Sequence, residues 1–225
     1  MNTSYLSLLI QRQAQKYGER VALKYRDYAT STWIPVSWNQ LSDKVSKVSR
    51  ALVALGMLAQ ENIGVFSQNK PECLYTDFGA FGVRAVTVPL YATSSEAQVH
   101  YILQDAAIRF LFVGEQYQYD VASRVQNLCH TLKRIIVFDS SVKLAPGDTN
   151  SLCYEDFLAL GDNMELQQQV DKLTAESSPQ DLANILYTSG TTGESKGVML
   201  HHSCYEAAFK AHHGRLTTLG EQDVV

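Results

Sequence analysis

Five short apolar runs, separated by stretches with helical periodicity, constrain the fold of this chain more than any other feature. The runs lie at residues 63–67, 85–89, 109–113, 134–138 and 182–187. Each has the length of a strand and is apolar almost throughout, as expected for strands buried on both faces of a parallel sheet. Strands that alternate with helices in this way are typical of the α/β class. The sequence therefore predicts a mostly parallel sheet flanked by helices.

The segment before the first run predicts several further elements. These are a helix over 6–17, extended runs at 21–26 and 32–36, and a second helix over 38–55. Gly18 ends the first helical pattern, and the two extended runs are spaced as a hairpin. Ser37 and Gln40 have the spacing of a capping box, and the helix they open keeps its apolar period until Gly56.

Two of the helices between the strands have recognisable starts. Pro71 suits the first turn of a helix, where its missing N–H needs no partner. Thr93 and Glu96 match a capping box, which predicts a helix that opens at Thr93 and packs its apolar side on the sheet. The polar stretch 139–151 contains Pro, Gly and Asp and predicts a surface loop.

Composition excludes several classes of protein. The chain has 225 residues, of which 45% are apolar and 19% charged, so it is long enough to bury a core. Its net charge of −4 and the absence of a basic block argue against nucleic-acid binding. No run approaches the roughly 20 apolar residues that span a bilayer. We expect no signal peptide, because no basic residue precedes the short apolar run at 5–10. The sequence therefore predicts a cytoplasmic protein without a transmembrane segment.

Cysteine and histidine spacing gives no support for a metal site. The four cysteines form no C-x-x-C pair, which predicts reduced thiols. If one helix carried both histidine doublets, His202 and His213 would share a face but lie ~16 Å apart. Zinc requires ligands that converge within about 2.1 Å of one point. We therefore expect both doublets, His201/His202 and His212/His213, to lie on a solvated helix face.

The last apolar run leads into a loop rich in glycine and hydroxyl groups, YTSGTTGESKG, at residues 187–197. Its glycines allow backbone N–H groups to approach a ligand, its hydroxyls add donors, and Lys196 adds a positive charge. Open α/β folds bind ligands at the carboxyl edge of the sheet, where this loop lies. The candidate phosphate-binding residues are Thr188, Ser189, Gly190, Thr191, Thr192, Gly193 and Lys196.

Two other nucleotide-binding motifs do not fit this loop. The P-loop pattern G-x-x-x-x-G-K-S/T, counted from Gly190, requires glycine at Ser195 and a hydroxyl residue at Gly197. The residues after the loop also read as a strand instead of the helix that follows a P-loop. The dinucleotide pattern G-x-G-x-x-G is absent as well, which argues against a dehydrogenase.

The loop resembles the phosphate-binding signature of the adenylate-forming acyl-CoA synthetase superfamily, Y/F-T-S-G-S/T-T-G-x-P-K-G. Residues 187–197 match it at every position except Ser195, which replaces the proline. The following VMLHH is similar to the family's V-M-x-T-H, which makes His202 a secondary candidate. Upstream, N-x-P-E, VPLYAT and YIL-x-D occur in the order found in long-chain fatty-acyl-CoA ligases. The resemblance covers nearly the whole chain.

The resemblance implies an enzyme that activates a carboxylic acid with ATP and Mg²⁺ to an acyl-adenylate and then transfers the acyl group to coenzyme A. Residues 188–196 would surround the β- and γ-phosphates, and Lys196 would balance their charge. Thr188 would contribute a hydroxyl ligand to Mg²⁺, an ion that usually keeps several waters. The expected partners are a fatty acid, ATP and CoA.

The family's enzymes are more than twice as long as this chain, so we expect it to be the N-terminal portion of a larger ligase. Residues 1–62 would pack with a later subdomain of that protein, and residues 63–225 would form an α/β subdomain. The adenine and ribose contacts, the hinge and the catalytic lysine would lie beyond Val225, so no complete catalytic site is expected.

Alternative functions remain open from the residues alone. The chain is interpreted first as part of a long-chain acyl-CoA ligase, and second as a non-catalytic nucleotide-binding or interaction module. A ligase for aryl or amino acids and a P-loop phosphotransferase are further alternatives, of which the last fits the loop poorly. Because long-chain acyl substrates partition into membranes, peripheral attachment to the inner face of a membrane also stays open, although no basic amphipathic helix favours it.

Overall fold

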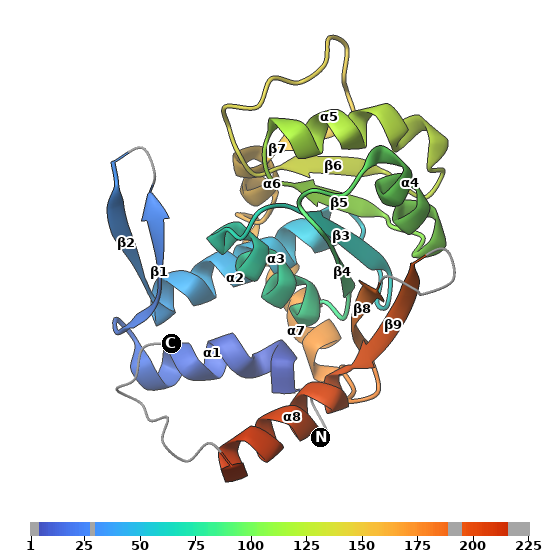
Figure 1. Cartoon of the computed structure of the whole chain (residues 1–225). Helices are drawn as coiled ribbons and strands as arrows, with labels where there is room; N and C mark the ends of the chain where they lie inside the picture. The colour runs from blue at the N-terminus through green and yellow to red at the C-terminus, as the bar shows by residue number, and fades with distance from the viewer. Residues whose placement is uncertain (1–4, 28–29, 189–194, 216–225) are drawn as a thin grey trace.

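The computed structural model describes residues 5–27, 30–188 and 195–215 (Figure 1). Within them, seven strands form one sheet in the order β7-β6-β5-β3-β4-β8-β9, and β1 and β2 form a separate hairpin. Neighbours in the large sheet are parallel except β8 and β9, which are antiparallel. Helices cover both faces, so the predicted α/β class is confirmed.

The bounds of the elements are as follows. The strands are β1 (Val21–Asp27), β2 (Thr32–Ser37), β3 (Asn62–Phe66), β4 (Val86–Leu90), β5 (Phe110–Val113), β6 (Arg134–Val137), β7 (Ser151–Cys153), β8 (Leu182–Thr188) and β9 (Lys196–His201). The α-helices are α1 (Tyr5–Tyr17), α2 (Trp38–Ala54), α3 (Pro71–Gly82), α4 (Glu96–Asp105), α5 (Gln116–Val125), α6 (Tyr154–Leu160), α7 (Gln167–Ala175) and α8 (His202–Arg215). Short 3₁₀ turns are η1 (Gln126–Leu128) and η2 (Met164–Leu166).

All five predicted buried strands are present, as β3, β4, β5, β6 and β8. Side chains on β5 show why their sequences are continuously apolar. Phe110 and Phe112 pack with α2, α3, α6 and α7 on one face, whereas Leu111 and Val113 pack with α4 and α5 on the other. Successive side chains of a strand point to opposite faces, so a sheet covered on both sides needs apolar residues at every position. Figure 1 shows these two helical layers.

The N-terminal elements also form as predicted. Gly18 and Gly56 have φ values of +54° and +75°, the left-handed conformation that ends helices. Ser37 caps α2: its side chain accepts from the N–H of Gln40, and the Gln40 side chain accepts from the Ser37 N–H. The apolar side of α2 packs against the sheet in the same cluster as Ile63. The expected packing of residues 1–62 with a later subdomain stays a prediction.

The predicted start of α4 is wrong by two residues. A tight turn comes first, in which the N–H of Ser94 donates to the carbonyl of Tyr91 at 2.8 Å, and Thr93 is exposed within it. Ser95 is the actual N-cap, because its side chain accepts from the N–H of Gln98 and its own N–H donates to the Gln98 side chain. Since serine and threonine both fit a capping box, spacing alone could not separate the two registers.

A pair of alanine substitutions tests this correction. Ser95→Ala removes the cap and is expected to lower the free energy of unfolding by about 1 kcal/mol. Thr93→Ala removes an exposed turn residue and is expected to change it by less than about 0.5 kcal/mol. Urea denaturation of both variants measures the difference. A larger loss of unfolding free energy for Thr93→Ala would instead support Thr93 as the N-cap.

The topology sets a switch point between β3 and β4 at the carboxyl edge of the sheet. After β3 the chain runs through α3 on one face, and after β4 it runs through α4 on the other. Adjacent strands whose connections leave to opposite faces mark the position where open α/β sheets bind ligands. The carboxyl end of β8 lies at the same edge, beside β4. Within the described residues, no helix has both the length and the apolarity needed to cross a bilayer.

Candidate functional site

The glycine-rich segment connects the two strands of a hairpin at this carboxyl edge. Thr188 is the last residue of β8 and is the register partner of Lys196, the first residue of β9. Ser189, Gly190, Thr191, Thr192 and Gly193 lie outside the described residues, and their predicted phosphate contacts stay predictions. The strand-like run after the loop is β9, so the segment does not open a helix as a P-loop does.

Thr188 and Lys196 are both exposed at the open end of this hairpin. No carboxylate of the described part of the chain forms an ion pair with Lys196. An ammonium group that is neither buried nor paired keeps its full charge for an incoming anion. The hairpin therefore presents a hydroxyl and a positive charge on either side of the loop.

Helix α4 holds the two ends of the loop. The Tyr187 hydroxyl, next to Thr188, donates to Asp105 at 2.5 Å, and burial together with this carboxylate raises the Tyr187 pKa. The Tyr101 hydroxyl donates to the carbonyl of Ser195 at 3.0 Å. The rings of Tyr101 and Tyr187 also meet edge to face, with centroids 6.3 Å apart. One helix thus fixes the residues that precede and follow the loop.

Sequence reasoning did not assign Tyr101 and Asp105 to the site, although a signal was present. They are the first and last residues of the YIL-x-D motif, and residues four apart share one face of a helix. Two polar side chains on one face of a helix that covers a sheet are candidates for contact with a strand below it. Only the strand order shows that this strand is β8, the one that carries the loop.

Gly197 is required by close packing. A Cβ at this position would lie 2.8 Å from Cγ2 of Ile185 and 3.2 Å from Cζ of Tyr187, both on the neighbouring strand. Separations this short force neighbouring atoms to move. The last glycine of the motif therefore lets β9 approach β8 and bring Lys196 opposite Thr188.

Polar contacts attach β8 to its neighbours. Thr87 and Asn184 are the register partners that join β4 and β8, and the Asn184 amide donates to the Thr87 hydroxyl at 2.5 Å. The Tyr205 hydroxyl of α8 donates to the other end of the same amide at 2.6 Å. Because Asn184 is buried, these bonds satisfy groups that water cannot reach.

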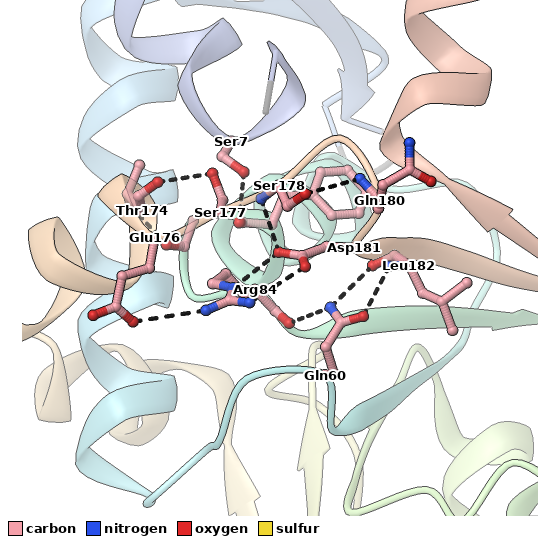
Figure 2. A network of polar contacts seen from close by, with 12 residues as sticks. Ser7, Gln60, Arg84, Thr174, Glu176, Ser177, Ser178, Gln180, Asp181 and Leu182 are labelled. Carbon is pink, nitrogen blue, oxygen red and sulfur yellow. Dashed lines mark hydrogen bonds and ion pairs between the residues drawn. The ribbon is translucent and has the colours of Figure 1, made fainter. Parts of the chain in front are cut away.

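A larger polar network holds the amino end of β8 (Figure 2). The Arg84 guanidinium donates to both carboxylate oxygens of Asp181, at 2.8 and 3.3 Å. The Gln60 side chain accepts from the N–H of Leu182 at 2.8 Å and donates to the carbonyl of Arg84 at 3.0 Å. Glu176 adds a weaker ion pair with Arg84 at 3.7 Å. The strand that carries the loop is thus fixed at its far end as well.

The structure places the secondary candidate, His202, away from the loop. At roughly 3.4 Å per residue, the six-residue step along β9 from Lys196 to His202 covers about 20 Å. His202 is 1% exposed and packs edge to face on Phe81, with ring centroids 5.3 Å apart. Its expected position on a solvated helix face is therefore wrong. The contact with Phe81 of α3 covers this first residue of α8, which explains the difference.

Burial lowers the pKa of His202 from 6.5 to about 4, so the ring is neutral at pH 7. The unfolded chain therefore binds more protons than the folded chain between pH 6.5 and 4, and stability falls as pH falls through this window. Relative to its own value at pH 7, wild type should lose on the order of 2 kcal/mol more at pH 4.5 than His202→Phe. Urea denaturation of wild type and His202→Phe at both pH values measures these losses of unfolding free energy. Equal losses in the two proteins would contradict the prediction.

Comparison with known proteins connects this geometry to a family. A model of the AMP-binding enzyme family matches residues 10–225. The long-chain-fatty-acid–CoA ligase ACSBG2 of Xenopus laevis is 29% identical over 194 residues, which cover 86% of this chain and 26% of the relative. FadD15 of Mycobacterium tuberculosis, also a long-chain-fatty-acid–CoA ligase, is 28% identical over 89% of this chain and 32% of the relative. The chain thus spans about a quarter to a third of these relatives.

Solved structures share the fold. The anthranilate CoA ligase AuaEII, in complex with anthranoyl-AMP, superposes with a TM-score of 0.76 at 22% identity. The match covers 91% of this chain and 36% of the AuaEII chain. A long-chain-fatty-acid-CoA ligase, FadD1 of Archaeoglobus fulgidus, gives 0.72 at 23% identity, with 97% of this chain and 40% of its own covered. At these sequence identities, the structural similarity shows a shared fold.

Proposed function

Because the chain belongs to the AMP-binding enzyme family, we propose that it is the N-terminal part of a longer ATP-dependent ligase that converts a long-chain fatty acid into its CoA thioester. The observation that carries this proposal is the hairpin at the carboxyl edge of the sheet. There Thr188 and Lys196, which pairs with no carboxylate among the described residues, lie on either side of the glycine-rich loop, next to the position where this fold class binds ligands.

The loop and Lys196 would act on the phosphates of ATP. In adenylate formation, an oxygen of the fatty-acid carboxylate attacks the α-phosphorus and pyrophosphate leaves with its bonding electrons. Both reactants are anions, so the site must hold them together and stabilise the charge that develops on the leaving group. Residues 188–193 would supply N–H and hydroxyl donors, and the Lys196 ammonium would stay close to the departing oxygens.

Mg²⁺ is proposed as a companion of ATP, with Thr188 as a protein ligand. The exposed hydroxyl at the end of β8 fits this part, because Mg²⁺ commonly takes few protein ligands and completes its shell with phosphates and water. In the described part of the chain, no three His, Cys, Asp or Glu side chains gather into a metal cluster. Contacts to adenine, ribose and CoA are expected from the remainder of the longer protein, which we propose is cytoplasmic.

Tyr101 is proposed to position the loop through the carbonyl of Ser195. In the full-length protein, Tyr101→Phe is expected to raise KM for ATP about threefold to tenfold, the effect of losing one ordinary hydrogen bond. KM for the fatty acid should not change. Tyr205→Phe is the control, because it removes a similar hydroxyl bond from β8 at a distance from the loop. Equal effects of both variants on KM for ATP would contradict the positioning role.

The choice of a long-chain fatty acid rests on the relatives, whose names specify that substrate class. An aryl acid is the second candidate, because a structure with the same fold is an anthranilate CoA ligase. The test incubates the full-length protein with ATP, Mg²⁺ and CoA and a panel of palmitate, oleate, benzoate, anthranilate and amino acids. Acyl-CoA formation from palmitate or oleate is expected. Activity confined to aryl or amino acids would reject the substrate, and no activity with any acid would favour a non-catalytic module.

A further inference from the structure

An open cleft of about 410 Å³ lies at the edge of the sheet opposite to the loop. It is lined by the residues that begin β5 and β6, whereas Thr188 and Lys196 lie at the carboxyl edge. Leu55 and Leu132 supply apolar surface, and Arg109, Lys133 and Arg134 supply cationic groups. Four of its seven lining residues are polar or charged, so the cleft suits an anionic group with a small apolar part.

The positive charges in this cleft exceed the negative charges that oppose them. Arg109 forms an ion pair with Glu61 at 2.8 Å. Lys133 and Arg134 pair with no carboxylate in the described part of the chain. Pairing of one cation leaves a surplus of two positive charges, which matches a dianion. A phosphate monoester carries close to two negative charges at neutral pH, as phosphorylated side chains do.

Backbone and side-chain bonds fix the segments that carry the cationic groups and orient two of these groups. The N–H of Lys133 donates to the carbonyl of Arg109 at 2.8 Å, which joins the starts of the two strands. Arg134 donates from its guanidinium to the side-chain oxygen of Asn150 at 3.1 Å. The Lys133 ammonium donates to the carbonyl of His130 at 3.1 Å. These acceptors are neutral, so they orient the cations without cancelling their charge.

One further carboxylate, Asp148, lies next to the lining residue Asn150 but forms no ion pair with a cation of the described residues. Asp148 accepts from the N–H of Asn150 at 2.8 Å and also from Tyr119 and Ser151. These bonds use both of its oxygens and keep its pKa below the usual range in spite of partial burial. Its bonds are therefore made to its own loop and to α5.

We propose that this cleft binds a phosphate monoester with a small apolar group, at a site separate from the ATP-binding loop. Arg134 and Lys133 would bind the phosphate oxygens, and Leu55 and Leu132 would contact the apolar group. The same phosphate chemistry occurs in a free metabolite and in the headgroup of an anionic lipid. The proposal does not depend on the reaction assigned to the carboxyl edge.

The test uses phenyl phosphate, titrated calorimetrically into the full-length protein. Wild type and Lys196→Ala should bind it alike, whereas Lys133→Gln/Arg134→Gln should bind at least about tenfold more weakly, since two charged hydrogen bonds are lost. Glutamine keeps a donor for the carbonyl of His130 and for Asn150, so the fold should persist, and the unfolding temperature checks this. Lys172→Gln, an exposed lysine of α7, is the matched control and should bind like wild type.

A second arm separates the sources of phosphate. Vesicles of phosphatidylcholine with phosphatidic acid are sedimented with the same four proteins, and pure phosphatidylcholine vesicles give the baseline. Phenyl phosphate binding without sedimentation would support a free phosphate monoester, and sedimentation lost only in the double variant would support the lipid headgroup. Absence of both signals, equal binding by the double variant, or loss of binding in Lys196→Ala would overturn the proposal.

Discussion

Lys196→Ala in the full-length protein is expected to lower kcat/KM for ATP in adenylate formation by about 100-fold, the usual effect of removing one group that stabilises a developing oxyanion. Lys196 is exposed at the open end of the hairpin, directly opposite Thr188. Its ammonium would face pyrophosphate as the leaving group accumulates charge. The substitution removes that charge and leaves the backbone pairing of β8 and β9 in place, so the loss should be catalytic and not structural.

Two variants separate this effect from a general change of surface charge. Lys172→Ala removes an exposed lysine from α7, on the other side of the sheet from α4, and should keep wild-type kinetics. Lys196→Arg keeps the charge in a different shape and should recover part of the lost activity. Pyrophosphate exchange gives the rates. A loss below about threefold for Lys196→Ala would contradict the assigned role, because one ordinary hydrogen bond can account for that much.

Arg84→Met is expected to cause the largest loss of stability, about 3 kcal/mol of unfolding free energy. Asp181 is mostly buried, with 10% of its side chain exposed, and its two oxygens accept from the Arg84 guanidinium (Figure 2). Methionine replaces much of the apolar stem of arginine but leaves this carboxylate without a countercharge. The variant should also loosen the amino end of β8, which this network joins to α3 and α7.

A matched ion pair elsewhere provides the control. Arg124 donates to Glu96 at 2.7 Å, nearly the same distance, but about half of each side chain is exposed. Exposed pairs usually contribute less than about 1 kcal/mol, so Arg124→Met should have little effect. Urea denaturation of the two variants tests whether burial of the partner, and not the count of ion pairs, decides stability. Equal losses would contradict that explanation.

Much of the fold was predictable because its strands are buried on both faces. A run such as 109–113 has few alternatives to a central parallel strand when helical patterns flank it. Glycines and caps at helix ends were equally informative, as Gly18 and Ser37 show. The start of α4 was not predictable, since Thr93 and Ser95 both offer a capping hydroxyl and only the preceding turn selects between them.

The sequence predicts a chemistry for the candidate site but not the contacts that support it. A loop of glycines and hydroxyls with Lys196 indicates phosphate binding by residue type alone. Its contacts with Tyr101 and Asp105 depend on strand order, because α4 lies about 80 residues before β8 in the sequence and meets it only in the sheet. The burial of His202 depends likewise on Phe81 of α3, which no local pattern places beside α8.

Calorimetric titration of ATP with Mg²⁺ into the full-length protein tests the central claim most directly, because it measures binding at the loop without assuming a substrate acid. Wild type should bind ATP, Lys196→Ala should bind at least about tenfold more weakly through loss of a charged contact, and Lys133→Gln/Arg134→Gln should match wild type. Unchanged ATP affinity in Lys196→Ala, or affinity lost only in the Lys133→Gln/Arg134→Gln variant, would contradict the assignment of the nucleotide site to the hairpin at the carboxyl edge.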